Sequence, residues 1–199
     1  MAKIITIGRQ FGSNGRAIAK NLADHLGIAF YDKQLIGLAA EKSELPVESL
    51  VEVDEKKTNP LLYASVDYKI GAGYSTTAPI NDVLFQAQSE VIRGLAQKED
   101  CVIVGRCADF VLRSHPEARH VYIYAPLDKR IQTVCERDGV GSKEAQSIIK
   151  KIDKQRRLYY SYYTDLKWGS FENYHLALDS GRMSMDNAVE LLSLLYGQI

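Results

Sequence analysis

The stretch IITIGRQFGSNGRAIAKNLADHLGIAFY, residues 4–31, decides the fold that we expect for the whole chain. Residues 3–7, with isoleucine at 4, 5 and 7, predict a buried strand, and a loop with three glycines (Gly8, Gly12 and Gly15) follows it. Residues 16–26 then place their apolar side chains on one helical face, and Gly27 ends that helix. Residues 28–31 predict a second strand. A glycine-rich loop between a strand and a helix is typical of a turn that binds phosphate.

Strands and helices alternate along the rest of the chain. We expect further strands at 101–104, 120–124 and 174–178, and helices at 34–41, 81–97, 127–137, 142–164 and 184–196, with one more opening at 45–46. Ser184 is the expected N-cap of the last helix. Residues 58–79 show no clean period and predict a long mobile loop. The alternation predicts a parallel sheet with helices on both faces.

Composition restricts the classes of protein that this chain can belong to. Its 199 residues suit one domain, 1–199, and 25 basic residues balance 25 acidic ones. The balance argues against a dedicated nucleic-acid binder, which is normally basic. We find no signal sequence and no run of about 18 apolar residues, so we expect a cytoplasmic protein without a membrane partner. Three cysteines without CxxC spacing fit free thiols better than a zinc site, and an oligomer stays open.

The glycine loop combines flexible backbone with positive charge. Glycines let backbone N–H groups turn inward, and the following helix adds the positive end of its dipole. Arg16 lies in the first helical turn and Arg9 offers a second cation. The alternative is a plain turn with an exposed arginine. The residues expected to hold the donor phosphates are Gly8, Arg9, Gly12, Ser13, Asn14, Gly15, Arg16 and Ala17.

The loop departs from the phosphate-binding pattern GxxxxGK[ST] in three ways. Gly8 lies two residues too far from Gly15, Arg16 replaces the lysine, and Ala17 lacks the hydroxyl that would hold magnesium. Ser13, Asp32, or only water and phosphate would have to hold a metal ion instead. Gln10 also rules out the GxGxxG spacing of a dinucleotide site.

Two other strand ends carry charged residues, and ligands of open parallel sheets bind beyond such ends. Asp32 and Lys33 follow the second strand, and Arg106 follows the third. Asp32 would contact an acceptor hydroxyl or metal-bound water, or simply cap the helix at 34–41. Arg106 would clamp the phosphate of an acceptor in a bidentate manner, or form a structural ion pair with Asp109.

The long helix at 142–164 places an arginine on its apolar face. At about 100° per residue, Arg156 falls in the middle of an apolar stripe. An arginine there needs a buried partner or an anion, which a lid facing a phosphate cleft would supply; the alternative is that it snorkels near the helix end. Arg157 flanks the stripe and is a weaker candidate. Arg130 and Arg137 share a face of the preceding helix. They would either join the same cationic cluster or lie in solvent, and we favour the solvated position.

Four segments together resemble the cytidylate kinase-like family, a branch of the P-loop nucleoside monophosphate kinases. They are ITIGRQFGSNGRAIAKNLADHLGIAFYDKQLI, VIVGRCADFVL, KKIDKQRRLYYSYYTDLKWG and NYHLALDSGRMSMDNAVELL, in chain order. The resemblance implies a three-layer, doubly wound fold with a five-stranded parallel sheet in the order 2-3-1-4-5. It also implies a helical acceptor-binding insertion at 33–80 and a helical lid at 139–170.

The resemblance further implies an ATP- and Mg²⁺-dependent transfer of phosphate to a nucleoside monophosphate, with CMP or dCMP as the acceptor. It implies that Arg106 binds the acceptor phosphate and that Arg156 or Arg157 bridges donor and acceptor. We expect Arg16, Arg106 and Arg156 to be catalytic, and the acceptor to contact Asp32, Lys33, Arg106, Asp109 and Arg157. In this respect too the chain resembles the branch, whose members tend to have arginine at the position of Arg16. Two alternatives remain: a non-catalytic nucleotide sensor that signals through 58–79, and a kinase of a non-nucleotide small molecule.

Overall fold

The computed structural model describes residues 2–43, 45–56, 65–70 and 74–199. Five parallel strands form its main sheet, in the order β2-β5-β1-β6-β7. They are β1 (Ile4–Arg9), β2 (Ala29–Tyr31), β5 (Cys101–Val104), β6 (Ala118–Tyr124) and β7 (Leu176–Asp179). The numbering departs from the expected 2-3-1-4-5 because two strands outside this sheet come between β2 and β5. Counted within the sheet alone, the strands follow 2-3-1-4-5.

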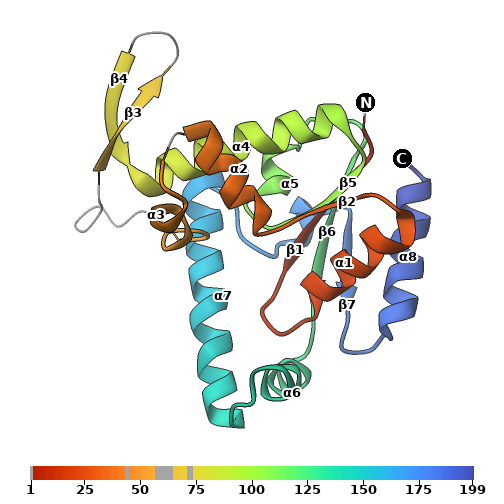
Figure 1. The fold of residues 1–199 in the computed structure, drawn as a ribbon. Coiled ribbons are helices and arrows are strands. Elements are labelled where there is room, and N and C mark those ends of the chain that lie inside the picture. Colours follow the sequence, from red (N-terminus) through yellow and green to blue (C-terminus); the bar gives the residue numbers. More distant parts are fainter. Residues whose placement is uncertain (1, 44, 57–64, 71–73) are drawn as a thin grey trace.

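Helices cover both faces of the sheet, as the alternation of elements predicts (Figure 1). One face packs on α1 (Gly15–Leu26) and α8 (Met185–Gly197). The other packs on α2 (Gln34–Ser43), α4 (Ile80–Lys98) and α5 (Ala108–Val111). The remaining helical elements are α3 (Val47–Val51), α6 (Leu127–Asp138), α7 (Ser142–Thr164) and η1 (Phe171–Asn173). Ser184 caps α8 as expected, because its hydroxyl accepts the N–H of Asn187 at 3.2 Å.

The central strand explains why the sheet is buried on both sides. Successive side chains of a strand point to opposite faces. Ile5 and Ile7 therefore pack toward α1 and α8, while Ile4 packs toward α4 and α5. All three side chains are at most 1% exposed, and burial of each contributes about 1.5–3 kcal/mol to the free energy of folding. The three cysteines are free, as expected.

The expectation of a loop over 58–79 is wrong for the part of it that the structure describes. β3 (Ser65–Ile70) and β4 (Tyr74–Pro79) pair as an antiparallel hairpin, which projects from the body of the molecule (Figure 1). The sequence SVDYKI alternates apolar and polar residues, the pattern of a strand. The glycines and prolines around this run are typical of loops, so the segment as a whole predicted a loop. Residues 57–64 and 71–73 lie outside the described part.

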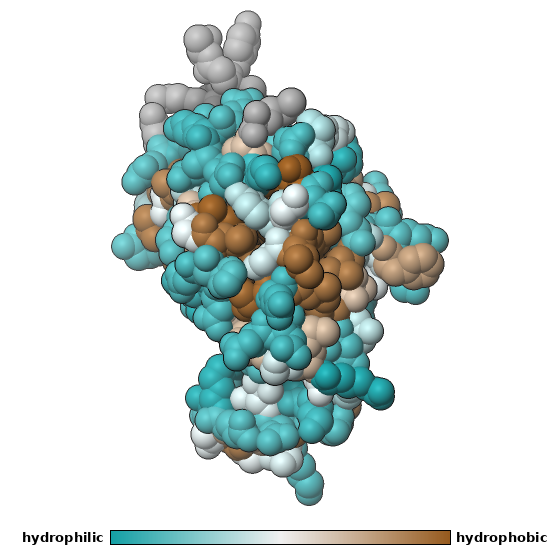
Figure 2. Space-filling view, turned by 90° about the vertical axis from the view of Figure 1, so that its right-hand side faces the viewer, coloured by the Kyte–Doolittle hydropathy of each residue, from teal (hydrophilic) through white to brown (hydrophobic). Residues whose placement is uncertain are grey.

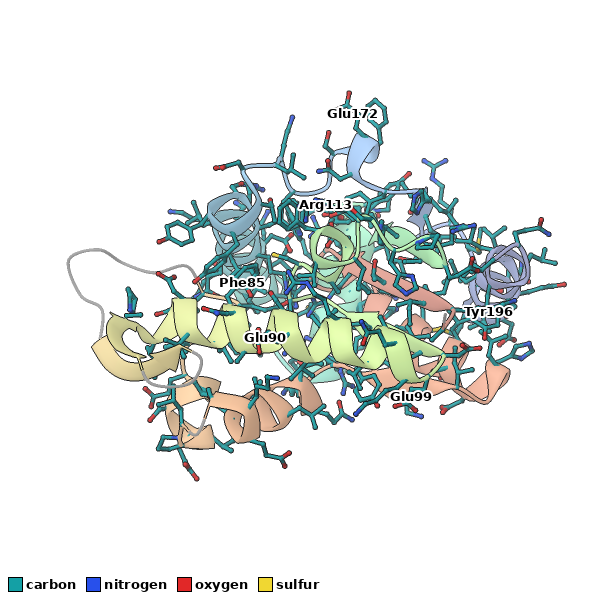
Figure 3. The ribbon with its side chains drawn as sticks, turned by 90° about the horizontal axis from the view of Figure 1, so that it is seen from above. Phe85, Glu90, Glu99, Arg113, Glu172 and Tyr196 are labelled. Carbon is teal, nitrogen blue, oxygen red and sulfur yellow. The ribbon has the colours of Figure 1, made fainter. Side chains whose placement is uncertain are left out.

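Aromatic side chains attach the C-terminal half of α7 to α4. Phe85 points from α4 toward α7 (Figure 3) and stacks on Tyr163 with ring centres 4.0 Å apart. Tyr159 meets the same phenyl ring edge-on at 6.2 Å. The N-terminal half of α7 packs Ala145 and Ile149 against Val134 of α6. The expected lid helix therefore packs on α4 in its C-terminal half and on α6 in its N-terminal half.

Hydrophilic side chains cover much of the α8 side, and apolar side chains gather near the middle of this face (Figure 2). Leu191 and Leu194 of α8 are 37% and 64% exposed. No helix in the described ranges is long and apolar enough to cross a membrane.

Candidate functional site

The loop between β1 and α1 has a fixed backbone that depends on glycine. Gly12 has φ +80°, and a Cβ atom there would lie 2.8 Å from the carbonyl oxygen of Arg130. The Ser13 hydroxyl donates to the Gln10 and Ile123 carbonyls at 2.9 and 3.2 Å, so it holds the loop to β6 from within. Asn14 follows in the left-handed region with φ 57° and opens α1. The loop is thus shaped before any ligand binds.

A cavity of about 210 Å³ lies over this loop and the start of α1. Its lining residues are Arg9, Gln10, Phe11, Gly12, Asn14, Gly15, Arg16, Ala17, Arg137 and Arg156. Four of the ten are arginines, and α1 directs the positive end of its dipole at the same space. This cavity suits a polyanion such as the phosphates of a nucleotide.

The segment after β5 places Arg106 beside that cavity. Gly105, Arg106 and Cys107 have φ values of 75°, 53° and 54° in succession, and a non-glycine residue in this region costs about 1–2 kcal/mol. A side chain at Gly105 would overlap the guanidinium of Arg9 and the carboxylate of Glu55. The backbone is therefore held in a costly shape that brings three charged side chains together.

A second cavity, of only about 20 Å³, lies next to Arg106 and shares two residues with the first. It is lined by Gly8, Arg9, Glu55, Gly105, Arg106, Cys107, Arg156, Tyr159, Tyr160 and Trp168. Arg9 and Arg156 line both cavities. The two spaces are thus neighbours across a wall of two guanidinium groups.

Carboxylates neutralise this arginine cluster. Glu55 accepts two bonds from Arg9, at 2.7 and 3.2 Å, and one from Arg156 at 3.3 Å. Asp54 and Asp32 accept from Arg106, at 2.5 Å each. Burial alone would raise the pKa of the Glu55 carboxyl, but the guanidinium groups of Arg9 and Arg156 hold that pKa well below its usual value. Glu55 is therefore held in its charged form.

Asp32 bridges the two ends of the site. Its second oxygen accepts from Nε of Arg16 at 2.5 Å. Burial raises the pKa of its carboxyl, and Arg106 and Arg16 together lower that pKa below the usual value. For Arg106, burial opposes the charge, yet Glu55 and Asp54 outweigh it and raise the pKa of its guanidinium. Asp32 thus connects the glycine loop to Arg106 rather than serving mainly as a helix cap.

Asp153 attaches the expected lid helix to the glycine loop. One carboxylate oxygen accepts the backbone N–H of Phe11 at 2.8 Å, and the other accepts Nη1 of Arg130 at 2.6 Å. Arg130 also donates to the Phe11 carbonyl at 3.3 Å. Arg130 is 9% exposed, so the expectation that it lies on a solvated face is wrong.

The structure brings most of the predicted residues to one place. Arg156 has a side chain 15% exposed and donates to Glu55 and to the Arg9 carbonyl, as its position on the apolar stripe predicts. Of the expected loop residues, Gly8 lines the smaller cavity instead and packs against tyrosine rings. Ser13 is engaged within the loop.

Three expected acceptor contacts lie elsewhere. Asp109 does not pair with Arg106; its carboxylate accepts the Tyr160 hydroxyl at 2.7 Å, and burial raises its pKa to about 6. Lys33 is exposed, and neither cavity, as the described residues outline them, includes it. Arg157 is exposed and lines a separate cavity between α6 and α7.

Sequence reasoning missed three participants. Arg137 is exposed, as expected, but it also lines the larger cavity, where its guanidinium lies 4.8 Å from the centre of the Phe11 ring. Asp54 and Glu55 lie between α3 and the hairpin, where the sequence shows no clear motif. Three acidic residues in the run EVDE were the one available signal that a counter-charge follows α3.

The residues of the site do not form a ready protein site for Mg²⁺. Ala17 offers no hydroxyl, the Ser13 hydroxyl is bonded within the loop, and both Asp32 oxygens face arginines. Within the described ranges, no group of three or more His, Cys, Asp or Glu residues is arranged to hold a metal. Magnesium carried by nucleotide phosphates keeps several waters and needs few protein ligands.

The fold and this site define a kinase-like α/β protein with a glycine-rich loop after β1 and an arginine cluster at the strand ends. The model of the cytidylate kinase-like family matches residues 4–182, and the chain belongs to that family. A curated relative, the cytidylate kinase of Methanopyrus kandleri, is 26% identical over 95% of this chain and 90% of its own length.

Solved structures confirm the fold. An uncharacterized protein from Eubacterium ventriosum is 28% identical, with a TM-score of 0.74 and 99% of each chain covered. The shikimate kinase of Bacteroides thetaiotaomicron is 13% identical, with a TM-score of 0.54 and 98% of each chain covered. The shikimate kinase of Acinetobacter baumannii, solved in complex with shikimate, is 15% identical, with a TM-score of 0.53. The match covers 100% of this chain and 95% of that one. At these identities the two shikimate kinases show the P-loop kinase fold alone.

Proposed function

We propose that this protein transfers a phosphoryl group from ATP to a nucleoside monophosphate, with CMP or dCMP as the acceptor. The family and the named relative support a kinase of this general kind. The observation that carries the proposal is the wall of Arg9 and Arg156 between the two cavities. A phosphoryl group moving from one cavity to the other would pass between permanently charged guanidinium groups.

In this proposal the larger cavity takes the donor. The inward backbone of Gly12 to Gly15, the helix dipole and Arg16 contact the ATP phosphates, and Arg137 with Phe11 borders the nucleoside end. The smaller cavity takes the acceptor phosphate, with Arg106 as the clamp. Residues 33–80 form the acceptor-binding insertion and 139–170 form the lid.

Catalysis then rests on position and charge, because phosphoryl transfer needs little covalent chemistry from the protein. Arg16, Arg106 and Arg156 would neutralise charge as it moves from the donor to the acceptor oxygen. Asp32 would orient Arg16 and Arg106 through the contacts that it makes now. Mg²⁺ would be held by ATP phosphates and water, and it would add charge neutralisation at those phosphates.

Release of ADP on a panel of acceptors tests the proposal. Wild-type protein with ATP and Mg²⁺ is expected to form ADP with CMP or dCMP and to leave shikimate and other non-nucleotide acceptors unchanged. Arg156→Gln should lower kcat/KM by at least about a hundredfold, as loss of a transition-state arginine does. Arg113→Gln, an exposed arginine at the far end of β5 and α5, is the matched control.

Each alternative has its own result on the same panel. ADP formed only with non-nucleotide acceptors would replace the nucleotide assignment. Tight ATP binding by calorimetry without turnover on any acceptor would indicate a nucleotide sensor and refute the kinase proposal.

A further inference from the structure

The carboxylate of Glu55 lies inside the proposed acceptor cavity and contacts the residues that would bind a phosphate there. It bonds to both terminal nitrogens of Arg9 and to Nε of Arg156. Its side chain is 17% exposed, and those of Arg9 and Arg156 are 8% and 15% exposed. A forked anion between two guanidinium groups reproduces the contacts that a phosphate oxygen pair makes.

The cavity has no room for both anions. The space open to the centre of a water molecule there is about 20 Å³, which suits about one water, because one water needs roughly 10–15 Å³ by that measure. A phosphate group needs more space than a water molecule. An acceptor phosphate can therefore reach Arg9 and Arg156 only after the Glu55 carboxylate has left.

The chain around Glu55 is held in a way that allows such a movement. Glu55 has φ 54°, an unfavourable left-handed backbone for a residue with a long side chain. The segment is attached to α4 by polar contacts: Asn81 Nδ2 donates to the Lys56 carbonyl at 3.0 Å, and Gln88 Nε2 donates to Asp54 at 3.1 Å. The present position of Glu55 therefore carries a backbone cost, and polar contacts hold its neighbours Asp54 and Lys56 to α4.

We propose that Glu55 is a specificity-determining residue of the acceptor site, an internal monoanion that the acceptor must displace. Exchange of one carboxylate for another gains no charge between Arg9 and Arg156. Exchange for a phosphate dianion gains one negative charge in a buried site, where the interaction is strong. Glu55 therefore selects acceptors with a phosphate over acceptors with a carboxylate. The role of Glu55 in selecting an acceptor rests on the proposed function. The anion-binding site between Arg9 and Arg156 does not depend on it.

Binding of simple anions tests the inference without ATP or turnover. Wild-type protein, Glu55→Gln and the control Glu52→Gln are titrated with inorganic phosphate and with acetate, by calorimetry and by thermal denaturation. Glu52 is exposed on the same segment. Glu55→Gln is expected to bind phosphate at least about tenfold tighter than wild type and to gain measurable acetate binding. Glu52→Gln should behave as wild type.

A double variant distinguishes this site from phosphate bound at the glycine loop. Arg156→Gln added to Glu55→Gln should abolish the gain, because the gain depends on the vacated guanidinium groups. Glu55→Asp, whose shorter side chain reaches the arginines less well, serves if Glu55→Gln does not fold, and it should show a smaller gain of the same sign. Equal or weaker phosphate binding by the Glu55 variants would overturn the inference.

Steady-state kinetics distinguish a failure of this inference from a failure of the proposed function. If the protein phosphorylates CMP, Glu55→Gln should lower the KM for CMP and leave the KM for ATP unchanged; a raised KM for CMP would instead mean that Glu55 positions the arginines. If no acceptor is phosphorylated but phosphate binding rises in Glu55→Gln, the proposed function fails and the anion site stands.

Discussion

Replacement of Asp153 by alanine should destabilise the protein strongly, because this carboxylate joins α7, α6 and the glycine loop. It is 8% exposed and accepts Nη1 of Arg130 at 2.6 Å and the N–H of Phe11 at 2.8 Å. Its removal leaves the buried Arg130 charge without its carboxylate, which costs about 3–5 kcal/mol. The Phe11 N–H loses its acceptor as well, and that loss adds about 1 kcal/mol. We expect a total of about 4–6 kcal/mol.

Urea denaturation of four proteins measures this effect. Asp153→Ala is compared with wild type, with Lys154→Ala on the exposed face of α7, and with Arg130→Met/Asp153→Leu. The Lys154 control should stay within about 0.5 kcal/mol of wild type. The double variant should recover most of the loss, because it removes both charges and restores apolar volume. A loss below about 1 kcal/mol in Asp153→Ala, or a loss in the double variant as large as that in Asp153→Ala, would refute the reasoning.

Three further predictions concern the core, the loop and the donor cavity. Burial lowers the pKa of His120 to about 4, so the folded state binds fewer protons than the unfolded state below pH 6.5. The contribution of His120 to the free energy of unfolding is therefore complete above pH 6.5 and falls by about 2 kcal/mol between pH 6.5 and pH 5. The urea midpoint should fall more steeply with decreasing pH in wild type than in His120→Asn, and an equal dependence on pH would contradict the prediction. Gly12→Ala should cost about 1–3 kcal/mol in unfolding free energy and weaken ATP binding, because its Cβ would lie 2.8 Å from the Arg130 carbonyl; an unchanged melting temperature would show that the loop adapts. Arg137→Ala should raise the KM for ATP several-fold, from loss of about 1 kcal/mol, without changing the KM for the acceptor; equal changes in both would place Arg137 outside the donor cavity.

The parallel sheet could be predicted because its strands carry their own signal. Cys101–Val104 is apolar throughout and each of its residues is completely buried, as expected for a strand covered on both faces. The hairpin was missed because glycines and prolines dominate the sequence around it. The alternating run Ser65–Ile70 is only 6 residues long, so its strand signal is weak beside those residues.

The candidate site could be predicted only where one element positions the residue. The periodicity of α7 locates Arg156 on the buried face, and strand ends locate Arg106 and Asp32 at one edge of the sheet. Glu55 could not be found this way, because its partners lie 46 and 101 residues away in the sequence. No local pattern encodes such pairing, and only the folded chain shows it.

Formation of CDP and ADP from CMP and ATP, followed by phosphorus NMR, tests the central claim most directly. The two cavities that share Arg9 and Arg156 should support stoichiometric formation of both products by wild-type protein with Mg²⁺. Arg156→Gln should reduce the rate by at least about a hundredfold while the fold is kept. ATP that binds but yields no ADP with CMP, dCMP or UMP would contradict the claim.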